Sequence, residues 1–170
     1  DKRNADEAFT RKNTSLVWRG GLDREEFEII GKRFIEKYFR HPSYYQIEGK
    51  PVFMLYDLPN FIKGLGGFEQ AKAALDWFRA EVMKAGFKGL ELQLSMRKDS
   101  GKSLSAVPSD HSGTQKDLVE RLSFDTLTHY QFCHFTDVNR EYNEVMKDVV
   151  KDWDAISKSY AAKYYPHVSV

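Results

Sequence analysis

The sequence predicts an α/β fold, specifically a partial (β/α)8 TIM barrel that holds roughly strands four to seven with their helices. Strand-like and helix-like segments alternate over residues 51–170, and the strand-like segments begin near positions 51, 89, 125 and 166. This alternation is typical of right-handed βαβ units in a parallel sheet. An open doubly wound sheet fits it too. The last predicted strand reaches the end of the sequence, and no predicted strand precedes the first helix. Both features favour an interior piece of a larger barrel.

The N-terminal residues predict an irregular segment followed by a helix. Residues 1–22 are polar without a clear period, whereas residues 23–170 are expected to form part of one catalytic barrel, truncated at both ends. The helix begins at Asp23, because Asp23 and Glu26 fit a capping box. It ends before Pro42, because the residue that precedes a proline is disfavoured in helices.

The middle of the chain predicts a strand, a helix and a second strand. Residues 51–56 are apolar without alternation, as expected for a parallel strand that is covered on both faces. Residues 58–67 are expected to be a loop. Residues 68–85 have apolar side chains at helical spacing, with Gly86 as the C-cap, and residues 89–96 form the next strand.

The C-terminal part continues the same alternation. A turn-rich loop is expected over residues 97–113, followed by a short helix over residues 115–122 and a strand over residues 124–132. Residues 139–163 carry apolar side chains at helical spacing and predict the longest helix. The last strand is expected in the segment HVSV, residues 167–170.

The charge balance excludes some classes of partner. The chain has 26 basic and 25 acidic residues, so it lacks the strong positive field that attracts nucleic acid or an anionic membrane surface. No apolar run approaches the roughly 20 residues that a membrane-spanning helix needs. Cys133 is the single cysteine, so no internal disulfide can form.

The candidate site lies where the predicted strands end. Ligands of parallel α/β sheets bind at the carboxyl ends of the strands. Acids, amides, phenols and imidazoles at these ends suit a polyhydroxylated ligand. A structural role is the alternative: Asp57 could cap a turn, Tyr56 and Tyr130 could be core aromatics, and His129 could be a buried histidine. The residues selected are Tyr56, Asp57, Gln93, Ser95, Arg97, His129, Tyr130, Gln131, His167 and Ser169.

No cofactor or metal site is predicted. The segment GLGG, residues 64–67, lies between a strand and a helix but lacks the spacing of a phosphate-binding loop. His129, Cys133 and His134 do not have the spacing of a standard zinc site, and strand alternation would divide their side chains between two faces.

Three segments resemble a known group of carbohydrate-active proteins. HPSYYQIEGKPVFMLYD, residues 41–57, is similar to a segment of the WbsX-like proteins and of glycoside hydrolase family 99, the endo-acting α-mannosidases. SFDTLTHYQF and YYPHVSV resemble two later strands of the same proteins. The resemblance implies a (β/α)8 barrel that acts on an oligosaccharide or polysaccharide, together with the remaining part of that barrel.

The implied activity is that of a glycoside hydrolase acting on bacterial or host glycans. Such enzymes use two carboxyl groups that flank the scissile bond, and the family motif that carries this pair is absent from the chain. The resemblance assigns catalytic roles to Tyr130 and Asp57, with Tyr56 lining the sugar pocket. Two alternatives are a WbsX-type glycosyltransferase-like protein and a non-catalytic glycan-binding barrel. The expected location is periplasmic or extracellular.

Overall fold

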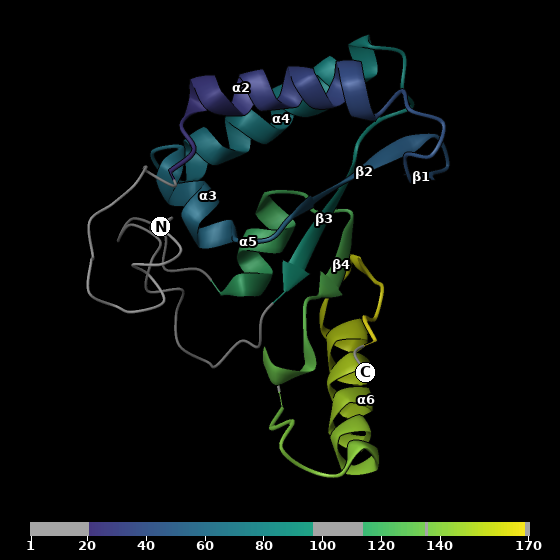
Figure 1. Ribbon diagram of the computed structural model, residues 1–170. Helices are drawn as coiled ribbons and strands as arrows, with labels where there is room; N and C mark the ends of the chain where they lie inside the picture. The colour runs from purple at the N-terminus through teal and green to yellow at the C-terminus, as the bar shows by residue number, and fades with distance from the viewer. Residues whose placement is uncertain (1–20, 97–113, 135, 169–170) are drawn as a thin grey trace, which may run out of the picture.

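The computed structural model describes residues 21–96, 114–134 and 136–168. In these ranges the chain forms a small α/β domain with five α-helices and one mixed, five-stranded sheet. The strand order is β1-β2-β3-β4-β5, and the sheet is curled into a half barrel (Figure 1).

The first two strands form an antiparallel hairpin. β1 (Gln46–Ile47) pairs with β2 (Lys50–Leu55), with Ile47 opposite Lys50. The two residues between them, Glu48 and Gly49, have φ values of 52° and 83°. Positive φ at both central positions is typical of the type I′ turn, whose twist matches that of a hairpin.

The remaining strand pairs are parallel, and helices connect them. β2 pairs with β3 (Glu91–Met96), β3 with β4 (Thr126–His129), and β4 with β5 (Lys163–Tyr164). The helices between these strands are α3 (Leu58–Gly64), α4 (Phe68–Lys84), α5 (Gln115–Arg121) and α6 (Tyr142–Ser159).

The N-terminal helix packs along α4. α2 (Arg24–Arg33) begins with the predicted capping box, in which the Asp23 carboxylate accepts from the Glu26 amide at 2.8 Å. It continues into a π-helical turn, Phe34–Tyr38. A Cβ atom on Gly31 would lie 3.1 Å from the Phe78 ring, so this glycine allows the two helices to approach closely (Figure 1).

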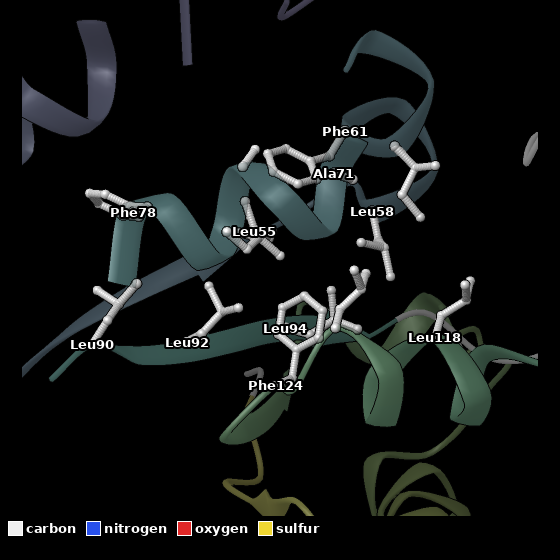
Figure 2. Close-up of a cluster of buried hydrophobic side chains, with 14 of the residues drawn as sticks. Leu55, Leu58, Phe61, Ala71, Phe78, Leu90, Leu92, Leu94, Leu118 and Phe124 are labelled. Carbon is white, nitrogen blue, oxygen red and sulfur yellow. The ribbon is translucent and has the colours of Figure 1, made fainter. Parts of the chain in front are cut away.

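The main hydrophobic core lies between the sheet and helices α3, α4 and α5. Figure 2 shows Leu92 and Leu94 of β3 pointing toward Leu55 and the α4 helix, with Phe124 and Leu118 on the α5 side. A second, smaller core lies under α6 and contains Phe132, Val145 and Val149. α6 therefore packs mainly through this smaller core, and its Ile156 side chain also packs against the main core.

The prediction of a partial (β/α)8 barrel is wrong. The sheet is mixed because β1 runs antiparallel to β2, whereas the strands of a (β/α)8 barrel are all parallel. β5 contains only two residues, which pair with Thr126 and Leu127. Helices and parallel strands do alternate from β2 to β5, but this alternation does not determine how the first strand pairs.

Several predicted element boundaries are also corrected. The expected loop at residues 58–67 contains α3, whose start is stabilised by Asp57 and by a proline in the first turn. The last strand lies at Lys163–Tyr164, and residues 165–168 are irregular, so the strand expected at residues 167–170 is not found in its described part. None of the helices in the described ranges has the length and apolar character to cross a membrane.

Candidate functional site

The strand register separates the sheet into two faces. Alternate side chains of a strand point to opposite faces, so Leu92, Leu94 and Leu127 lie on the face that packs against the main core. The opposite face, called the polar face below, carries one row of side chains from four neighbouring strands. This row contains Met54, Gln93, Thr126 and Lys163.

A second row of the polar face lies two residues closer to the carboxyl ends of the strands. Ser95 pairs with Thr128, and strand alternation places Tyr56 and Tyr165 at the two ends of this row. The backbone N–H of Tyr165 donates to the Leu127 carbonyl at 2.8 Å, so β4 and its neighbour stay paired beyond β5. The hydroxyl groups of Ser95 and Thr128 thus lie in a row between the aromatic side chains of Tyr56 and Tyr165.

Tyr56 and Tyr130 meet at the carboxyl end of the sheet. Their ring centroids are 4.9 Å apart at an interplanar angle of 76°, and the two side chains are 41% and 43% exposed. β3 lies between the strands that these two residues follow, and its residue level with Tyr56 is Ser95, which is 4% exposed. The two rings therefore meet across the end of the middle strand.

The polar groups next to this pair are held in place by hydrogen bonds. The Gln93 side-chain amide donates to the Thr126 hydroxyl at 3.4 Å. At the opposite end of β3, the buried Glu91 carboxylate forms an ion pair with Lys50 at 3.5 Å. Gln93 therefore lies on the polar face, with one of its donors facing a neighbouring strand.

Asp57 lies beside the aromatic pair but also caps a helix. Its Oδ1 accepts from the Asn60 backbone N–H at 3.1 Å, and its Oδ2 accepts from the Asn60 side-chain amide at 2.8 Å. This geometry is that of an N-cap residue. Both carboxylate oxygens of Asp57 thus take part in starting α3.

His129 lies on the core face of the sheet, opposite to Tyr130. It is buried, and its Nδ1 lies 2.6 Å from the Tyr164 hydroxyl oxygen. Burial raises the pKa of the Tyr164 phenol, and the Asp152 carboxylate raises it further. The protonated phenol can therefore donate to Nδ1, which leaves the proton of a neutral His129 on Nε2.

The other predicted site residues are distributed over different places. Gln131 accepts a hydrogen bond from the Cys133 thiol at 3.5 Å and lines a cleft after β4. The His167 ring lies 6.4 Å from that of Phe132. Arg97 and Ser169 lie outside the described residues. The structure thus brings together Tyr56, Tyr130, Ser95 and Gln93, whereas His129, Gln131 and His167 lie elsewhere.

Sequence reasoning missed the contribution of β5. The Lys163 ammonium lies 4.8 Å from the centre of the Tyr165 ring, and its hydrogen bond with Tyr165 raises the pKa of Lys163. Glu48 and Tyr45 of the hairpin region raise this pKa further. The paired tyrosines at positions 164 and 165, which alternate between the two faces, are the signal that could have placed this strand.

No metal centre emerges from the part of the chain that the structure describes. Groups of three or more His, Cys, Asp or Glu side chains that could hold an ion were not found there. The polar face instead offers hydroxyl, amide and aromatic groups, which bind neutral polar ligands.

Comparison with known proteins assigns no function to the candidate site, so its geometry is the basis for the proposal below. No family model, no curated protein and no solved structure matches the chain. The fold defines the protein as a small α/β domain with a curled, mixed sheet.

Proposed function

We propose that this chain binds carbohydrate on its polar face, with the Tyr56–Tyr130 pair as the main sugar-contacting surface. This aromatic pair is the observation that supports the proposal most directly. Tyrosine combines an apolar ring, which packs against the C–H groups of a sugar, with a hydroxyl that forms hydrogen bonds. Gln93 and Thr128 add an amide and a hydroxyl on the same face.

The resemblance to glycoside hydrolases supports the same substrate class, an oligosaccharide or polysaccharide. Hydrolysis, however, requires two carboxyl groups at the scissile bond. The family motif that carries this pair is absent from the chain, and the oxygens of Asp57, the acid that the resemblance places in the sugar pocket, accept hydrogen bonds from Asn60. Glu91 is buried against Lys50. Both carboxylates therefore already have structural partners. This favours the non-catalytic alternative, in which the described residues bind the glycan without cleaving it.

The proposal is tested by titrating the protein with a panel of neutral oligosaccharides and following binding by calorimetry. We expect Tyr56→Ala and Tyr130→Ala each to weaken binding of the best ligand by about 10-fold or more, because each removes an aromatic contact at the centre of the surface. Tyr142→Ala is the matched control, since Tyr142 is a similarly exposed tyrosine on α6. Equal affinities in all three variants, or no binding of any oligosaccharide, would overturn the proposal.

A second pair of variants tests the role of Asp57. Asparagine is as good an N-cap as aspartate, whereas alanine loses the cap at a cost of about 1 kcal/mol. We therefore expect Asp57→Asn to keep wild-type stability and sugar affinity, and Asp57→Ala to lose stability only. Loss of glycan hydrolysis in a fully folded Asp57→Asn variant would instead assign the carboxylate a catalytic role.

A further inference from the structure

A cleft of about 370 Å³ lies between the end of β4 and the start of α6. Its volume falls within the range of small-molecule sites in proteins. The cleft is lined by residues that are distinct from the aromatic pair of the polar face. Four of the lining side chains are apolar or aromatic: Phe132, Val138, Tyr142 and Val145.

The inner wall of this cleft is preformed. Phe132 and Val145 are buried, and both belong to the small core under α6. The Phe132 ring makes edge contacts with Trp153 on one side and His167 on another, each at 6.4 Å between centroids. A ligand would therefore meet a fixed apolar surface, which lowers the entropic cost of binding.

The outer part of the cleft is less buried and carries polar groups. Val138 and Tyr142 are 49% and 48% exposed, so they form an accessible apolar margin. The Gln131 amide and the Cys133 thiol provide a hydrogen-bonding edge. An occupant should thus combine a flat apolar body with a polar edge.

The charges around the cleft favour an uncharged occupant. Arg140 is the cation among the described lining residues, and its guanidinium already donates to Asp148 at 2.7 Å and to Thr136 at 2.8 Å. The hydrogen bond that Arg140 donates to Asp148, with the nearby Asp137 and Glu144 carboxylates, raises the pKa of Arg140. An anionic ligand would have to compete with these carboxylates, and a cationic ligand would meet the arginine.

We propose that this cleft is a second binding site, which takes a small neutral aromatic molecule with one hydrogen-bonding edge. The site is independent of the proposed sugar-binding surface, because it uses none of the residues assigned to that surface. Absence of ligand binding in this cleft and absence of sugar binding on the polar face are therefore separate experimental outcomes.

The charge requirement is tested with three fluorinated probes that share one ring system. These are 5-fluoroindole, the anionic 5-fluoroindole-3-acetate and the cationic 5-fluorotryptamine, each titrated into the full chain and followed by ¹⁹F NMR. We expect saturable binding of the neutral probe, at least about 5-fold tighter than that of either charged probe. Tighter binding of a charged probe, or no saturable binding of 5-fluoroindole, would overturn the proposal.

The location is tested with Val138→Trp, which fills the margin of the cleft. Val150→Trp is the matched control, because Val150 has a similar exposure and is absent from the lining of the cleft. We expect Val138→Trp to weaken 5-fluoroindole binding by about 10-fold or more and Val150→Trp to leave it unchanged. Equal binding by the two variants would contradict the location.

Cys133 provides an independent readout of the same site. It is the single cysteine of the chain, it is exposed, and it lines the cleft. Saturation with 5-fluoroindole should slow alkylation of the thiol by iodoacetamide at least threefold in the wild type. In Val138→Trp, adding 5-fluoroindole should not slow the alkylation of Cys133 further. Unchanged alkylation at a saturating probe concentration would overturn the assignment.

Discussion

The contact between His129 and Tyr164 links β4 to the short strand β5 on the core side of the sheet. Nδ1 and the phenolic oxygen are 2.6 Å apart, and the two rings meet edge to face at 5.5 Å. β5 pairs with only two residues of β4, and this side-chain contact adds to that short pairing. At the residue scale, Tyr164 is therefore expected to matter for stability.

We predict that Tyr164→Phe lowers the free energy of unfolding by about 1 kcal/mol at pH 7, the contribution of a typical hydrogen bond. The pKa of Tyr164 is raised in the folded state, so the folded protein keeps a proton that the unfolded chain releases above pH of about 10. Stability should thus fall as pH rises beyond this value. In Tyr164→Phe this part of the decline should be absent.

Urea unfolding at pH 7, 9 and 10.5 measures both effects. Tyr44→Phe is a useful comparison, because burial also raises the pKa of Tyr44. Tyr44→Phe should remove the share of the alkaline loss of stability that comes from Tyr44, and it should leave the contact between β4 and β5 intact. Parallel pH profiles for the wild type and Tyr164→Phe would show that the Tyr164 phenol does not titrate differently on unfolding.

The residue scale also shows what the sequence could predict of the site. The rule that ligands bind at strand ends selected both Tyr56 and Tyr130, whose rings lie in contact in the structure. It could not separate His129 from Tyr130, because consecutive residues of a strand point to opposite faces and the rule ignores this alternation. Tyr165 was missed because it follows a strand of only two residues, too few to show a period of their own.

At the scale of elements, the β1–β2 hairpin depends on a turn of unusual composition. Glu48 and Gly49 both have positive φ, which glycine adopts freely and glutamate does not. We predict that Gly49→Ala lowers the free energy of unfolding by about 1–2 kcal/mol, because it places a Cβ in the left-handed region. A Cβ at this position would also lie 3.1 Å from the Lys88 side chain.

Glu48→Asn should have the opposite effect. Asn-Gly is a preferred sequence for a type I′ turn, so this change should stabilise the protein by a few tenths of a kcal/mol, up to about 1 kcal/mol. Thermal melts followed by circular dichroism measure both variants. Equal melting temperatures would mean that the hairpin opens without cost to the rest of the sheet.

The same hairpin explains why the fold class was predicted only in part. Residues 51–56 read as a buried parallel strand, and β2 does pair in parallel with β3. Its other edge pairs with β1, which is two residues long and gives no hydrophobic signal of its own. A barrel and a curled mixed sheet share the same alternation of helices and strands, and this pairing distinguishes them.

At the scale of the whole molecule, the two long helices are anchored very differently. α4 buries six residues in the main core, whereas α6, which is one residue longer, buries two in the small core. Helices in proteins are stabilised mainly by packing of their apolar face. The buried residues of α4 are Phe68, Ala71, Ala74, Leu75, Phe78 and Val82, and those of α6 are Val145 and Val149.

We therefore predict that α6 opens without global unfolding. Regions with few buried contacts open at a lower free energy than the core does. Amide protons of α6 should exchange at least about tenfold faster than those of α4, which corresponds to a difference of about 1.4 kcal/mol in opening free energy. Hydrogen exchange followed by NMR measures this helix by helix. Val149→Ala should speed exchange in α6 and leave α4 unchanged, whereas equal rates in the two helices of the wild type would mean that both cores unfold as one unit.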